Sequence, residues 1–70
     1  MSEEGGNMKL IMKSLFDELR LNDKNEYDAD KEGVSMLVRI YRDGRLIAKK
    51  KQYKNRIQYF GVKGCEKFTN

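Results

Sequence analysis

The feature that most constrains this chain is residues 38–60, VRIYRDGRLIAKKKQYKNRIQYF, where apolar and aromatic residues alternate with Arg and Lys around one Asp-Gly pair. Alternation with a period of two is typical of a β-strand with one buried face. Asp-Gly favours a tight turn between two such strands. The sequence therefore predicts a β-hairpin whose first strand covers residues 34–41.

The length of the turn decides which side chains share a face of this hairpin. A two-residue Asp43-Gly44 turn places Val38 opposite Lys49 and buries the lysine, whereas a three-residue turn with a left-handed Gly44 places Val38 opposite Ala48. We expect the three-residue turn because it separates apolar from charged residues. Its core face comprises Met36, Val38, Ile40, Leu46 and Ala48, and its outer face comprises Leu37, Arg39, Tyr41, Arg45, Ile47, Lys49 and Lys51.

Residues 56–62, RIQYFGV, predict a third strand that completes an antiparallel meander. Placing Phe60 and Val62 on the core sends Ile57 and Tyr59 outward. The opposite choice fits the pattern nearly as well, so the buried face of this strand stays open.

Residues 8–21, MKLIMKSLFDELRL, carry apolar residues at helical spacing and predict an amphipathic helix. Asn7 is the expected N-cap and Asn22 the expected left-handed C-cap. The predicted fold class is therefore α+β, with one N-terminal helix packed on a three-stranded antiparallel β-meander.

Residues 1–7 are polar, contain two glycines and predict a disordered leader. Codons for residues 3–8 can contain GGAGG shortly before the ATG of Met8, which resembles a bacterial ribosome-binding sequence. One interpretation is that natural translation starts at Met8 in a bacterial, plasmid or phage gene. The alternative is a coincidence in a short leader. Residues 8–70 then form a single small domain.

Residues 22–33, NDKNEYDADKEG, are acidic and without an apolar period, and predict a loop. Residues 28–33 match the first half of a calcium-binding loop. The match ends there, because Arg39 occupies the position where a bidentate Glu is required. We therefore expect an exposed acidic loop and no metal site.

A chain of 70 residues buries a small core and usually needs support from a disulfide, a metal or a partner. Cys65 is the only cysteine and there is no histidine, which excludes an internal disulfide and disfavours zinc. A homodimer or another partner remains. The sequence has no apolar run of about 18 residues and no signal peptide, so we expect a cytoplasmic protein without membrane contact. We expect Cys65 to be an ordinary surface residue.

The charges are divided along the chain. Residues 1–32 contain five Lys/Arg and nine Asp/Glu, whereas residues 33–70 contain ten Lys/Arg and two acids. The basic sheet over residues 34–62 indicates an anionic partner. The simpler alternative is that the acidic loop neutralises the basic sheet within the molecule.

An outer face of cations and exposed aromatic rings suits nucleic acid, because cations neutralise phosphates and rings stack on bases. A two-stranded ribbon also fits the major groove of a duplex. The alternatives are a solvated face and a protein interface, as in a phage-encoded factor that inhibits or modulates a host enzyme or defence complex. No catalytic residue or cofactor site is expected. The candidate binding residues are Arg39, Tyr41, Arg42, Arg45, Ile47, Lys49, Lys51, Lys54, Arg56 and Tyr59.

Overall fold

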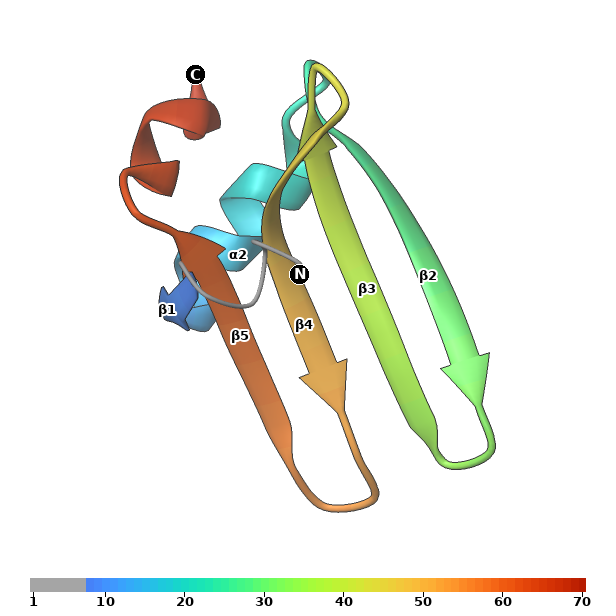
Figure 1. The fold of residues 1–70 in the computed structure, drawn as a ribbon. Helices are drawn as coiled ribbons and strands as arrows, with labels where there is room; N and C mark the ends of the chain where they lie inside the picture. Colours follow the sequence, from blue (N-terminus) through green and yellow to red (C-terminus); the bar gives the residue numbers. More distant parts are fainter. Residues whose placement is uncertain (1–7) are drawn as a thin grey trace.

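The computed structural model describes residues 8–70, which form a five-stranded antiparallel sheet in the order β1-β5-β4-β3-β2 with one α-helix on one side (Figure 1). We call the side that carries the helix the helix face and the other side the open face. The elements in chain order are β1 (Met8–Leu10), α2 (Lys13–Leu21), β2 (Glu26–Glu32), β3 (Ser35–Arg42), β4 (Arg45–Gln52), β5 (Ile57–Val62) and the 3-10 helix η1 (Cys65–Thr69).

The fold is α+β, but the prediction of a helix on a three-stranded meander is wrong. The three predicted strands correspond to β3, β4 and β5, and the sheet gains one further strand at each edge. Both additional strands come from segments whose side chains carry little apolar alternation. Their backbone pairing with an otherwise open sheet edge fixes their conformation, and backbone pairing leaves no mark on the sequence pattern.

The first correction concerns residues 8–21, which were predicted to be one helix. Residues 8–10 instead form β1, which pairs antiparallel with β5, and the Ile11 amide extends this pairing by donating to the Tyr59 carbonyl oxygen at 2.9 Å. The helix begins at Lys13 after Met12, and its C-cap Asn22 is extended rather than left-handed. The predicted N-cap Asn7 lies outside the described residues. Within residues 8–70, the helices are too short and too polar for a membrane crossing.

The second correction concerns the predicted acidic loop. Residues 26–32 form the edge strand β2, which pairs with β3 from Glu26 opposite Tyr41 to Glu32 opposite Ser35. All seven residues of β2 are exposed. An edge strand with charged side chains needs no apolar alternation, because neither face of it enters the core.

The third correction concerns the β3–β4 turn and register. The turn has two residues, Asp43 at φ 55° and Gly44 at φ 79°, and not three. A bulge then shifts the register, so that Tyr41 pairs with Leu46 and Ile40 pairs with Ala48. Both residues of the turn have positive φ, which is the conformation that favours Asp-Gly in tight hairpins.

Ile47 is the extra residue of this bulge. It was predicted to lie on the outer face, yet its side chain is fully buried in the core. A bulge places two residues of one strand opposite one residue of the other and so breaks the strict alternation of faces. The core contains Phe16, Leu19, Val38, Ile40, Ile47, Ala48 and Cys65.

The register also places Lys50 opposite Val38 on the helix face, whereas the predicted register placed Ala48 opposite Val38. Lys50 is only half-buried. It lines a cleft beside α2 together with Asp17. A lysine is tolerated here because its methylene stem covers apolar surface while the ammonium remains hydrated. The Lys13 hydrogen bond lowers the pKa of Asp17, and the nearby charges of Arg20 and Lys50 act in the same direction.

The buried face of β5 is the one that the sequence left open. Tyr59 packs on Phe16, with ring centroids 5.2 Å apart, so Tyr59 faces the helix and Phe60 faces the open side. Cys65 is fully buried, contrary to the expected surface position. A Cβ on Gly61 would stand 2.7 Å from the Cys65 Sγ, which explains why glycine fits this position of β5.

Candidate functional site

Two lysines and one aromatic ring form a compact group at the centre of the open face. Lys49 pairs with Phe60 across β4 and β5, and Lys51 lies two residues further along β4. The Lys49 and Lys51 ammonium groups lie 5.9 and 5.8 Å from the centre of the Phe60 ring. Because alternate residues of a strand share a face, the sheet itself places these three side chains together. We call them the Lys-Phe cluster.

The lysines of the Lys-Phe cluster differ from Arg39 in having no direct ion-pair partner among the described residues. Neither forms an ion pair with any acid of residues 8–70. Phe60 is half-buried, so part of its ring remains accessible. The cluster therefore offers two cations and an aromatic surface side by side, the combination that suits a phosphate beside a base.

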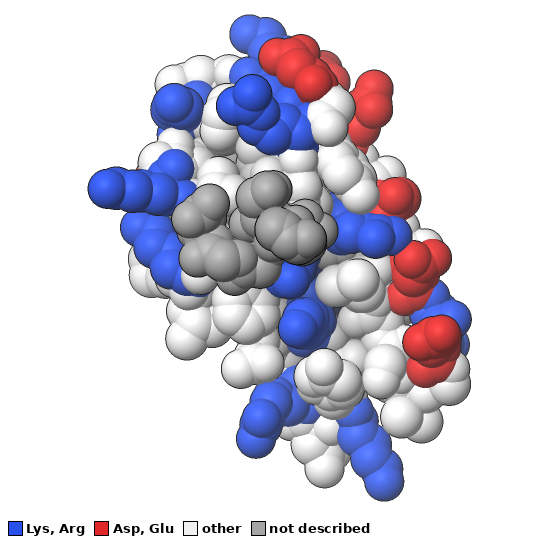
Figure 2. All heavy atoms as spheres, in the orientation of Figure 1, with Lys and Arg blue, Asp and Glu red and all other residues white. Residues whose placement is uncertain are grey.

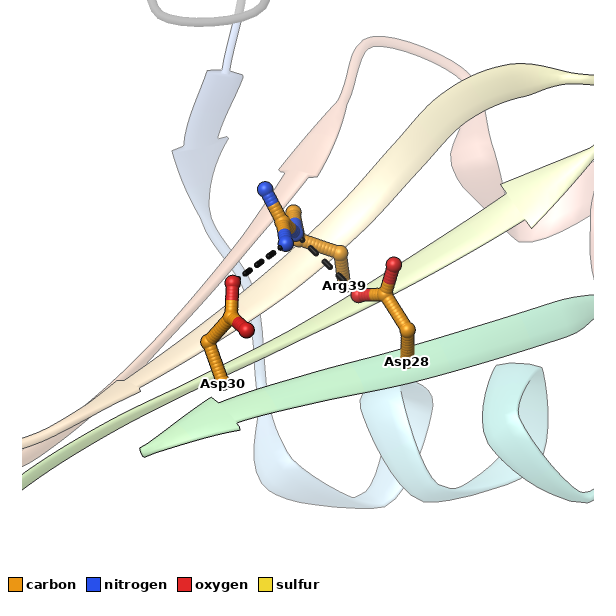
Figure 3. A network of polar contacts seen from close by, with 3 residues as sticks. All are labelled: Asp28, Asp30 and Arg39. Atoms are coloured by element: carbon orange, nitrogen blue, oxygen red, sulfur yellow. Dashed lines mark hydrogen bonds and ion pairs between the residues drawn. The ribbon is translucent and has the colours of Figure 1, made fainter. Parts of the chain in front are cut away.

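Among the candidate binding residues, Arg39 is the one whose charge is neutralised by ion pairs. Its Nε donates to an Asp28 carboxylate oxygen at 3.2 Å and its Nη2 to an Asp30 oxygen at 2.7 Å (Figure 3). The hydrogen bond to Asp28 raises the pKa of Arg39. The alternative of internal neutralisation by the acidic segment therefore applies to Arg39 and does not extend to the Lys-Phe cluster.

The acids and cations of the open face are separated in space. In the view of Figure 2, most acidic side chains lie along the side formed by β2 and at the top of the molecule, and basic side chains are spread over much of the remaining visible surface. Tyr41 lies opposite Glu26 near the acidic side, and it is half-buried. The open face thus has an acidic rim at β2 and a basic centre at β4 and β5.

The guanidinium group of Arg42 is held by hydrogen bonds within the molecule. Its Nε donates to the Asn25 side-chain oxygen at 2.6 Å, and its Nη2 donates to the carbonyl oxygens of Phe68 at 3.1 Å and Asn70 at 3.3 Å. Asn25 in turn donates to the carbonyl oxygen of Leu19 at 2.8 Å. Arg42 therefore ties the end of α2 and the C-terminal segment to β3.

The remaining candidates are dispersed over the molecule. Ile47 is in the core and Tyr59 faces the helix. Lys54 and Arg56 are exposed in the connection between β4 and β5, and Arg45 is exposed next to the β3–β4 turn. Of the ten predicted residues, only Lys49 and Lys51 join the Lys-Phe cluster.

Two parts of this arrangement were missed by the sequence argument. Phe60 was assigned to the core in the first choice for β5, although the equivalent second choice places it beside the lysines. Asp28 and Asp30 were assigned to a loop, although their spacing of two residues is the spacing of side chains on one face of a strand. If residues 26–32 had been taken as a strand, the two aspartates would have predicted an ion pair with a cation on the neighbouring strand.

The open face combines unpaired cations with an aromatic ring. Among residues 8–70, no three acidic or cysteine side chains gather as metal ligands. Burial raises the pKa of the Cys65 thiol, and Glu66 acts in the same direction, which disfavours the nucleophilic thiolate. Comparison of the chain with protein-family models, curated proteins and solved structures found no match.

Proposed function

We propose that the open face binds single-stranded nucleic acid, with the chain acting as a small non-catalytic accessory protein. The observation that carries this proposal is the Lys-Phe cluster, where two ammonium groups lie within 6 Å of one ring on a face that no described element covers. Lys49 and Lys51 contact phosphates in this proposal, and Phe60 supports a base by stacking.

The width of the sheet favours a single strand over insertion into a duplex groove. β3 and β4 are flanked by β2 and β5, so they do not project as a free two-stranded ribbon. Five strands at about 4.8 Å spacing span about 19 Å, whereas the major groove is about 12 Å wide. A sheet face with a partly accessible ring instead resembles the stacking surfaces that bind unpaired bases.

The experiment that tests stacking separately from charge is a substitution of Phe60→Leu. It keeps the charge and an apolar side chain but removes the aromatic plane. We expect the affinity for a labelled single-stranded oligonucleotide to fall about tenfold while its salt dependence is unchanged. Tyr53→Leu is the matched control, because Tyr53 is an exposed aromatic residue in the β4–β5 connection, outside the cluster. Equal affinities for the Phe60 variant and the unchanged protein would remove stacking from the proposal.

A second candidate function is protein binding, and the observation that favours it is β2. This edge strand is exposed over all seven residues, and an exposed edge can pair with a strand from another protein. Leu37, Tyr41 and Ile47 were predicted on the outer face and could have formed the apolar centre of such an interface, but Ile47 is buried in the core. Capture of a host protein after nuclease treatment, abolished by Ala29→Pro in β2, would favour this function over the first.

The proposed setting is the cytoplasm of a bacterium or of a phage-infected cell. The ribosome-binding sequence that the codons before Met8 can contain supports a prokaryotic or phage gene. The free Cys65 thiol is compatible with a reducing compartment.

A further inference from the structure

A second cationic site lies at the end of the sheet where β4 begins and β5 ends. At this end, β4 extends further than β5. The last β4–β5 pair joins Ala48 and Gly61, so the first residues of β4 have no partner in β5. η1 lies beyond this end of β5 (Figure 1). A hollow of about 740 Å³ is lined by the first residues of β4, the end of β5, η1 and β1, and we call it the basin. Its volume is within the range of about 300–1,000 Å³ typical of small-molecule sites.

The charge of the basin is of one sign. Four of its nine lining side chains are basic and none is acidic; the basic ones are Lys9, Arg45, Lys63 and Lys67. None of the four forms an ion pair with an acid of residues 8–70. They come from four different parts of the chain, namely β1, β4, the β5–η1 turn and η1. Convergence of unpaired cations on one hollow strongly favours an anion.

The remaining lining of the basin is apolar and includes Leu46, Val62 and Phe68. Such a wall suits a ligand with a sugar or base next to its charge. Val62 follows Phe60 by two residues on β5, which places it on the same face about 7 Å further along the strand. The Val62 wall of the basin therefore belongs to the face that carries the Lys-Phe cluster.

We propose that the basin binds a phosphomonoester group attached to a nucleoside. Resting on the proposed function, this group is the phosphorylated end of the bound strand, and a free nucleotide is the other source of the same chemistry. A terminal phosphate carries nearly two negative charges at neutral pH, compared with one for each internal phosphate. Four cations without an acid match the terminal group better than an internal one.

The test uses one short oligonucleotide sequence with a 5′-phosphate, with a 3′-phosphate, or with hydroxyl groups at both ends. We expect one phosphorylated form to bind about tenfold more tightly than the hydroxyl form. Lys63→Gln with Lys67→Gln removes this preference and retains the affinity for the hydroxyl form. Lys49→Gln with Lys51→Gln weakens all forms equally and retains the preference. Lys24→Gln with Lys31→Gln, which removes two exposed lysines outside both sites, is the charge-matched control.

Equal affinities for phosphorylated and hydroxyl oligonucleotides would overturn the proposal, as would a preference that survives the loss of Lys63 and Lys67. If no oligonucleotide binds, the proposed function fails, and titration with thymidine monophosphate and with thymidine decides about the basin. Amide chemical shift changes in residues 62–68 with the monophosphate alone would support the basin as a nucleotide site. Absence of such changes would overturn it.

Discussion

Ile47 shows how strongly the environment of one side chain depends on one extra residue. Strict alternation places it outward with Arg45 and Lys49, but the bulge between the Tyr41 and Ile40 pairs turns it into the core. No residue type in RLIAKKK marks a bulge at this position, because a bulge of this kind requires no glycine. The core position of Ile47 is therefore visible only in the structure.

Replacing Ile47 with alanine tests its buried position. We expect Ile47→Ala to lower the free energy of unfolding by about 2–4 kcal/mol, because it removes fully buried methyl groups and leaves a cavity. Urea denaturation gives the value. Ile57→Ala is the control, since Ile57 is 49% exposed and its truncation has a smaller effect. Equal losses in the two variants would contradict the buried position of Ile47.

Cys65 predicts a specific dependence of stability on pH. Burial raises the pKa of its thiol above the ordinary 9.0, so the folded protein holds this proton more tightly than the unfolded chain does. The resulting contribution to stability is complete below the ordinary pKa and is lost as the pH rises through the folded pKa. Above about pH 8, the unfolding free energy should therefore fall more steeply with rising pH in the unchanged protein than in Cys65→Ala. Parallel pH profiles would show that the thiol titrates identically in both states.

At the scale of elements, β3 and β5 could be predicted from their partial alternation of apolar and polar residues, and β4 from the Asp-Gly turn that joins it to β3. The predicted and observed pairings differ by two residues, since Val38 pairs with Lys50 and not with Ala48. A shift of two preserves the faces of a strand, whereas a shift of one reverses them. For this reason the prediction put Lys49 and Lys51 on the correct face of the sheet, although the predicted register was wrong.

The edge strands could not be predicted in the same way. β2 carries Glu26, Asp28, Asp30 and Glu32, and acidic residues have low β-propensity. Its conformation follows from seven pairs with β3 and from the two bonds between Arg39 and the aspartates. The spacing of two residues between these acids fits a strand, but the pairing with β3 that decides the conformation is a contact between segments.

The ion pairs between β2 and β3 predict that the acidic rim weakens anion binding. Asp28→Asn with Asp30→Asn frees Arg39, and we expect a tighter complex with single-stranded oligonucleotide and a steeper salt dependence. Stability should change little, because the pairs are largely exposed. Glu18→Gln with Asp23→Asn removes the same charge elsewhere and serves as the control. An identical gain in both double variants would mean that only net charge matters, and not Arg39.

At the scale of the whole molecule, charge is arranged by the fold more than by the chain halves. The acidic segment becomes one rim of the sheet and neutralises Arg39, while the Lys-Phe cluster and the basin keep their charges. Five of the ten basic residues in 33–70 lie in these two sites, and the other five lie elsewhere on the sheet and its connections. Composition shows the excess of positive charge, but only the fold separates the paired cations from the unpaired ones.

The most direct test of the central claim is fluorescence anisotropy of labelled single-stranded and duplex DNA over a series of salt concentrations. We predict tighter binding of the single strand and a linear fall of log affinity with log salt. Lys49→Gln with Lys51→Gln should reduce the slope by about 1.4, which corresponds to two lost phosphate contacts on a single strand. Absence of binding at low salt, or an unchanged slope in the double variant, would contradict the assignment of the open face to nucleic acid.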